Sequence, residues 1–151
     1  MKANAAFKNA LFVLCFLGLS VQSGFGANSV QMLIGSAARE DNTASLAFVA
    51  LVPTPGHVFT TTATSLIMGM FVAECRMNTA GQRLEVQITV DGTVMNPGAA
   101  VLTTNTQYET HSHVAFRGQV PAGRHTVTVA WRVSGGRGYV RNRSLTVWEI
   151  R

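Results

Sequence analysis

Apolar and polar residues alternate with a period of two along most of the second half of this chain. Residues 83–91 read R-L-E-V-Q-I-T-V-D, and residues 124–134 repeat the pattern around Val127, Val129, Trp131 and Val133. Because successive side chains of a β-strand point to opposite faces, this period predicts strands that bury one face. No run of comparable clarity follows the helical period of about 3.6 residues, so the pattern predicts an all-β fold.

Turn-forming residues divide the alternating runs into about eight predicted strands. Each of three runs ends at a turn signal before the next run begins. These signals are Asp91-Gly92, Pro121-Ala122-Gly123 and Gly135-Gly136. Many short strands joined by tight turns are typical of an antiparallel β-sandwich or barrel. We expect strands over residues 30–38, 46–52, 57–62, 64–77, 83–91, 111–120, 124–134 and 140–150, with residues 99–104 as a further short candidate.

The first residues form a separate pattern. Lys2 and Lys8 precede an apolar run over residues 10–19, which reads A-L-F-V-L-C-F-L-G-L. Small and polar residues follow this run. This order is typical of a secretory signal peptide, and the run is shorter than the about 20 residues that span a bilayer. We therefore expect a signal peptide over residues 1–26 and a single β-sandwich domain over residues 27–151. The domain is expected to be secreted, extracellular or periplasmic, and free of the membrane. An N-terminal anchor that is never removed is the alternative.

Charge and cysteine content narrow the class of protein further. The net charge is +5, but both lysines lie in the predicted signal peptide, and the rest of the chain carries ten arginines against seven acids. Charged residues make up only 13% of the chain, which argues against a nucleic-acid-binding protein with a basic stripe. Cys75 is the one cysteine outside the signal peptide, so the predicted domain has no internal disulfide. Burial of the Cys75 thiol is expected, and an intermolecular disulfide is the alternative.

Residues 64–77 are apolar at both odd and even positions. A sandwich strand needs only one apolar face, so a second one indicates a subunit interface. In the last strand, Trp148 and Ile150 point outward if Leu145 and Val147 point inward. Loops of the same chain that cover these positions are an equal alternative. The predicted interface residues are Leu66, Met68, Met70, Cys75, Ala130, Trp148 and Ile150.

The C-terminal part of the chain carries a resemblance to a known group of domains. Residues 121–133 read P-A-G-R-H-T-V-T-V-A-W-R-V, Gly135-Gly136 follows, and residues 143–147 read R-S-L-T-V. This order resembles the closing strands of jelly-roll domains, such as C1q/TNF-like modules and the heads of secreted or phage-borne fibres. The resemblance covers about residues 83–149. It implies a jelly-roll-like β-sandwich that forms a homotrimeric binding or structural head without catalytic residues.

Glu109, His111 and His113 are the best candidates for a metal site. Their spacing of two places the three side chains on one face of a strand, opposite Val114 and Phe116, which belong to the apolar set of that strand. Imidazole and carboxylate groups are ligands for zinc or copper. The favoured alternative is an ordinary polar strand face that points to solvent, and no bound cofactor is expected.

Arginines and aromatic residues gather near the C-terminus. Such a set binds acidic glycans or phosphates, and its alternative role is to keep a sheet edge from pairing with other edges. The predicted ligand-binding residues are Arg137, Tyr139, Arg141, Arg143 and Trp148.

Three functions follow in order of preference. The chain contains no G-x-S-x-G, P-loop, H-E-x-x-H or EF-hand spacing. The leading hypothesis is therefore a secreted, non-enzymatic β-sandwich that acts by self-association or partner binding, as a structural or adhesion head and a homo-oligomer. A carbohydrate-binding, lectin-like module that stacks Tyr108, Tyr139 and Trp148 on sugar rings is the alternative. A small metal-dependent hydrolase is the least favoured.

Overall fold

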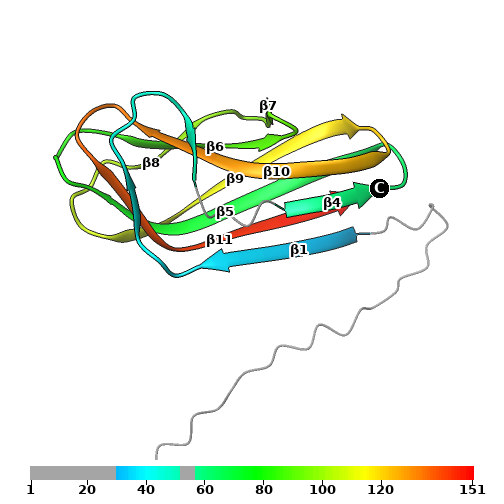
Figure 1. Cartoon of the computed structure of the whole chain (residues 1–151), viewed down its shortest axis with the longest axis horizontal. Helices are drawn as coiled ribbons and strands as arrows, with labels where there is room; N and C mark the ends of the chain where they lie inside the picture. The colour runs from blue at the N-terminus through cyan, green and yellow to red at the C-terminus, as the bar shows by residue number, and fades with distance from the viewer. Residues whose placement is uncertain (1–29, 52–56) are drawn as a thin grey trace, which may run out of the picture.

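The computed structural model describes residues 30–51 and 57–151, so the predicted signal peptide falls outside the described residues. The described chain is all-β, as the alternation predicts, and has eleven strands and no helix (Figure 1). No helix in these two segments has the length and hydropathy to span a bilayer. The strands are β1 (Val30–Ala37), β2 (Asp41–Thr43), β3 (Val49–Ala50), β4 (His57–Thr61), β5 (Ser65–Met77), β6 (Leu84–Val90), β7 (Thr93–Val94), β8 (Ala100–Thr103), β9 (Glu109–Val120), β10 (Gly123–Val133) and β11 (Gly138–Ile150).

The strands pack as two antiparallel sheets, which we name after a central strand of each. The β11 sheet has the order β1-β11-β5-β9, with β2 also beside β11. The β10 sheet has the order β3-β10-β6-β7, with β4 also beside β10 and β8 also beside β6. Because β1 and β2, β3 and β4, and β7 and β8 each share a neighbour, the eleven strands fill eight positions of a jelly-roll sandwich. The predicted antiparallel, jelly-roll-like β-sandwich is therefore confirmed.

The inner faces of the two sheets form the core. At the start of β11, Gly138 lets this strand approach the β10 sheet closely. A Cβ atom at Gly138 would lie 2.6 Å from Leu84 Cδ1 and 2.9 Å from Val133 Cγ1. The predicted inward residues are buried: Leu84, Val86, Ile88 and Val90 of β6, Val127, Val129, Trp131 and Val133 of β10, and Leu145 and Val147 of β11.

The orientation of β9 differs from the prediction. Val114 and Phe116 point outward and are 45% and 50% exposed, whereas Val120 is buried. The reason is an irregularity in the pairing with β5, where Arg117 and Val120 of β9 face Ile67 and Ser65. The extra residue in β9 reverses the alternation, so a period of two read through it assigns the wrong face to the first half of the strand.

Short strands and turns complete the sandwich. Asp91 and Gly92 have φ angles of 51° and 76° and reverse the chain between β6 and β7, as the Asp-Gly pair predicts. The alternation does not predict β2 and β7, which have three and two residues and are too short to show a period.

Candidate binding face on the β11 sheet

The central strand β5 has two apolar faces, as its sequence predicts. Ile67 and Phe71 point into the core and are fully buried. Met68 and Met70 lie on the opposite face and are partly exposed. The core is therefore complete on one side of this sheet, and the apolar residues on its other side have a separate role.

The neighbouring strands extend this outer apolar face. Trp148 of β11 and Phe116 of β9 both pair with Met68, one on each side of β5. We name the surface the apolar patch, and its residues are Leu66, Met68, Met70, Val72, Val114, Phe116, Trp148 and Ile150. Every one of these side chains is at least partly exposed, so the described part of the chain does not cover them. The alternative of covering loops is not observed within the described residues.

A cluster of arginines and tyrosines lies at the other end of the same face. The guanidinium carbon of Arg76 is 4.1 Å from the centre of the Tyr139 ring and 5.0 Å from that of the Tyr108 ring. Arg141 also lies over Tyr108, at 3.9 Å. We name these four residues the Arg–Tyr cluster. Because guanidinium groups cover the rings, less aromatic surface is free to stack on a sugar.

Acidic residues give this cluster mixed charge. Glu74 accepts hydrogen bonds from Arg141 Nε at 2.8 Å and from Asn142 Nδ2 at 3.0 Å. Hydrogen bonds from Asn142 and Arg141 lower the pKa of Glu74, so this carboxylate stays charged. Glu40 accepts a hydrogen bond from the Tyr108 hydroxyl. Both signs of charge therefore lie beside the apolar patch.

The structure divides the predicted ligand-binding residues. Tyr139 and Arg141 belong to the Arg–Tyr cluster, and Trp148 lies in the apolar patch. Arg137, which directly precedes β11, donates a hydrogen bond to Asn42 of β2. Arg143 is only 2% exposed, because it lies on the inward face of β11 with Leu145 and Val147, and the irregularity between Arg141 and Ser144 separates it from Arg141 on the outer face. Its guanidinium group contacts Asp41 and the carbonyl oxygen of Arg39, so its prediction as a surface ligand-binding residue is wrong.

The predicted interface residues also separate. Leu66, Met68, Met70, Trp148 and Ile150 meet in the apolar patch. Ala130 lies instead on the outer face of the β10 sheet. Cys75 is fully buried, and burial followed by the charge of Glu109 raises the pKa of its thiol to about 12. Cys75 is therefore a core residue, and its place in a surface interface is a wrong prediction.

The three predicted metal ligands share a face of β9, but this face points into the sandwich. Glu109 Oε2 is 3.3 Å from His111 Nε2. His113 is buried, and a hydrogen bond joins it to the backbone of Gly98. Among residues 30–51 and 57–151, no three His, Cys, Asp or Glu side chains meet in a group that could hold a metal ion. Glu109 and His111 are thus neighbours, while the three-ligand site is not assembled.

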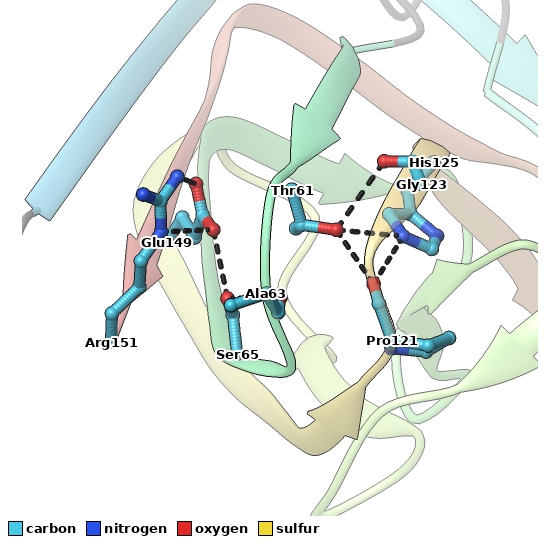
Figure 2. A network of polar contacts seen from close by, with 8 residues as sticks. All are labelled: Thr61, Ala63, Ser65, Pro121, Gly123, His125, Glu149 and Arg151. Carbon is cyan, nitrogen blue, oxygen red and sulfur yellow. Dashed lines mark hydrogen bonds and ion pairs between the residues drawn. The ribbon is translucent and has the colours of Figure 1, made fainter.

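A buried histidine network is not evident from the sequence, where His125 follows the Pro121-Ala122-Gly123 turn. Figure 2 shows His125 beside Thr61 and Pro121, where its Nε2 is 3.1 Å from Thr61 Oγ1 and 2.9 Å from the Pro121 carbonyl oxygen. On the other side of the ring, Nδ1 is 2.7 Å from Asp91 Oδ2. The tight turns that carry Asp91 and Pro121 are visible in the sequence, but only the fold brings them to one histidine.

The order Asp91, His125 and Thr61 is similar to the triad of nucleophilic hydrolases. Thr61 is 2% exposed, however, and its hydroxyl donates a hydrogen bond to the Pro121 carbonyl oxygen at 2.6 Å. A nucleophile must reach its substrate, and this hydroxyl is both buried and already bonded. The network therefore ties β4, β10 and two turns together at one end of the sandwich.

The outer face of the β10 sheet has a different character. Its central strands present polar residues, and Thr89 and Thr128 share a hydrogen bond of 2.7 Å. Arg132 Nε donates a hydrogen bond to Glu85 at 2.7 Å. Exposed apolar residues of the described chain lie along the two edges of this sheet. Leu46, Val49 and Val58 lie in or before β3 and β4, Val94 and Val101 lie in β7 and β8, and β10 and β6 separate the two groups. Among the described residues, the outer face of the β11 sheet therefore has a continuous apolar surface, and the outer face of the β10 sheet does not.

No family model and no curated protein matches the chain. Solved structures match its fold. The VP2 protein of infectious bursal disease virus, from the crystal structure of the VP2 subviral particle, has a TM-score of 0.52 and 14% identity, over 79% of this chain and 32% of VP2. Dimeric latent PorU from Porphyromonas gingivalis has a TM-score of 0.50 and 7% identity, over 82% of this chain and 13% of PorU.

A carbohydrate-binding module from Cellvibrio mixtus lichenase 5A, in complex with cellotriose, has a TM-score of 0.42 and 11% identity, over 80% of this chain and 88% of the module. This chain spans about a third of VP2 and a smaller part of PorU. At such low identity, the matches to VP2 and PorU show a shared β-sandwich fold and nothing of function. None of the three structures is a C1q/TNF-like module.

Proposed function

We propose that this protein is a secreted, non-enzymatic β-sandwich that acts by self-association through the apolar patch, as a structural or adhesion head. The observation that carries the proposal is the second apolar face of β5. Its inner face already supplies the core, so the outer face of Met68, Met70 and their neighbours is not required for folding of one chain. Exposed apolar surface of this kind marks a contact with another molecule.

The size of the patch supports this proposal. Residues 66–72 extend roughly 20 Å along β5, and the three strands β11, β5 and β9 extend about 14 Å across. The patch therefore covers about 300 Å², comparable with the largest apolar patch on a typical protein surface, which is often a functional one. The proposed secretion, to the outside of the cell or to the periplasm, is supported by the signal-peptide pattern of residues 1–26.

Size-exclusion chromatography with light scattering on residues 27–151 tests the proposal. We expect an assembly of defined mass that persists with reductant, because Cys75 is buried. Met68→Glu should give a monomer, since it places a charge in the centre of the patch. Gln87→Glu, on the outer face of the β10 sheet, is the matched control and should leave the assembly unchanged. A wild-type chain that stays monomeric at high concentration would contradict self-association.

The Arg–Tyr cluster supports carbohydrate binding as a second candidate function. The support comes from its two arginines rather than from ring stacking, because these arginines lie over the rings of Tyr108 and Tyr139. Guanidinium groups bind the acidic groups of a glycan. A glycan array with the wild-type chain and with Tyr139→Ala tests it. Binding that the substitution removes would favour this function, whereas no binding to any glycan would leave self-association alone.

A further inference from the structure

The apolar patch has a feature that restricts how copies of this chain can assemble. It is one continuous surface on one face of the molecule, whereas the exposed apolar residues of the β10 sheet lie on its flanking strands, where β10 and β6 separate Val58 from Val94 and Val101. Contacts that close a ring of three copies join two different complementary surfaces. A single surface instead packs against the same surface of a second copy, and such a contact has two-fold symmetry.

The size of the β11 sheet is consistent with that contact. By register, Val30 and Met32 of β1 pair with Ile150 and Trp148 of β11, so β1 widens the sheet beside the patch. Four strands extend about 19 Å across, which gives roughly 400 Å² of projected surface on each copy over the length of the patch. The accessible surface is larger than this projection because side chains protrude from it. The total area that two copies bury is therefore close to about 1,000 Å², the size that a specific interface needs. We expect a dimer that dissociates on dilution.

Charge determines the direction of the two-fold axis. An axis along β5 would place Arg76 of one copy against the same residue of its partner, and burial of like charges is costly. An axis across the strands places Leu66 opposite Val72 of the second copy instead. The apolar residues of β5 and β9 then overlap, with Phe116 opposite Val114 of the second copy, whereas Trp148 of β11 lies opposite Thr146. The two Arg–Tyr clusters lie at opposite ends in solvent.

We propose that two copies of this chain pack face to face through the apolar patch, with the two-fold axis across the strands at Gly69. Met68 of one copy then faces Met70 of the other, because these residues lie on either side of Gly69 on β5. This inference rests on the proposed self-association and adds its partner, symmetry and direction. It replaces the trimer that the resemblance implies.

Single cysteines and a short thiol-to-thiol crosslinker test the proposal on residues 27–151. Met70→Cys lies next to the axis, so we expect crosslinked dimers. Arg76→Cys lies about 20 Å from the axis along β5, which separates the two thiols by about 40 Å, and we expect no crosslink. The wild-type chain is the control for Cys75, and its buried thiol should not react.

Each outcome decides the proposal. A dimer mass in light scattering, with crosslinking at Met70→Cys and none at Arg76→Cys, supports it. Equal crosslinking of the two variants would overturn the direction of the axis. A trimer mass would overturn the two-fold packing while leaving self-association intact, whereas a monomer at every concentration would overturn both.

Discussion

The buried ring of His125 joins three segments that are distant in sequence. Each ring nitrogen lies within hydrogen-bond distance of an oxygen atom, Nδ1 near Asp91 Oδ2 and Nε2 near the Pro121 carbonyl oxygen. We expect His125→Phe to lower the free energy of unfolding by roughly 1–3 kcal/mol, because it keeps the contact with Phe59 but removes the hydrogen bonds of the buried ring. Urea unfolding followed by Trp fluorescence measures this change. Arg124→Ala, at the exposed neighbouring position, is the control and should change it by less than about 0.5 kcal/mol.

The burial of His113 predicts that the stability of the fold depends on pH. Burial lowers the pKa of His113 below its ordinary value of 6.5, although the Gly98 hydrogen bond opposes this shift. The unfolded chain therefore binds a proton more readily than the folded chain. Stability that is present above pH 6.5 is lost as the pH falls from 6.5 through the lowered folded pKa.

His113→Gln tests this prediction because glutamine keeps a donor for the Gly98 backbone but does not titrate. We expect the wild-type chain to lose stability between pH 7 and pH 5 faster than the variant, as measured by urea unfolding at intervals of pH. Glu149 acts at lower pH, because hydrogen bonds from Arg151 and Ser65 lower its pKa and its contribution disappears only as it protonates (Figure 2). Parallel pH profiles of the two proteins would contradict the role of His113.

These residues show where prediction from the sequence ends at this scale. Burial of Cys75 follows from its strand face, which it shares with Phe71 and Ala73. The role of His125 does not, because its partners lie 34 and 64 positions away and meet it only in the folded sandwich. Arg143 is similar, since its contacts with Arg39 and Asp41 cross more than a hundred positions.

At the scale of the element, Gly138 links one strand to the opposite sheet. A Cβ atom there would lie 2.6 Å from Leu84 Cδ1, within the core. We expect Gly138→Ala to destabilise the fold by about 1–3 kcal/mol through overpacking, measured by thermal or urea unfolding. Gly118→Ala is the matched control, because its nearest contact is 4.0 Å away and its change in stability should be much smaller. A loss of stability in Gly138→Ala as small as that in Gly118→Ala would contradict the role of Gly138 in the close approach of the two sheets.

The period of two predicts strands more reliably than it predicts faces. It identifies β6 and β10 with their inward residues, because both strands are regular over their predicted lengths. It fails in the first parts of β9 and β11, because the pairing of these strands shifts near Arg117 and near Asn142. Gln119 and Asn142 have φ angles of 57° and 45°, a conformation that neither residue type makes evident in the sequence. The candidate face was therefore predicted through β5 and β11, while the contribution of Phe116 was missed.

At the scale of the whole molecule, the sequence predicts an antiparallel sandwich or barrel because strand count and turns restrict an all-β chain to few architectures, and the resemblance of residues 83–149 adds the jelly-roll order. The sequence does not predict that the outer face of one sheet divides into two parts. The apolar patch and the Arg–Tyr cluster each combine residues of β5, β11 and the segment from residue 108 to residue 116. Sheet order and register place these residues together, and neither is encoded in any one strand.

Self-association through this face couples stability to protein concentration. A partner that binds only the folded chain shifts the unfolding equilibrium by mass action, so the midpoint of thermal unfolding should rise as the wild-type protein is concentrated. Met68→Glu removes the contact and should unfold at a midpoint that does not depend on concentration. Differential scanning calorimetry over a hundredfold range of concentration distinguishes the two proteins.

Gln87→Glu serves as the control in the same measurement, because it adds the same charge to the opposite face and should keep the concentration dependence. Salt provides a second check on the nature of the contact. The Arg–Tyr clusters remain in solvent in the proposed dimer, so the association should persist at high ionic strength, where exposed charge pairs are screened. An association that salt abolishes would instead place the contact at the charged end of the face and exclude the packing of apolar patch on apolar patch.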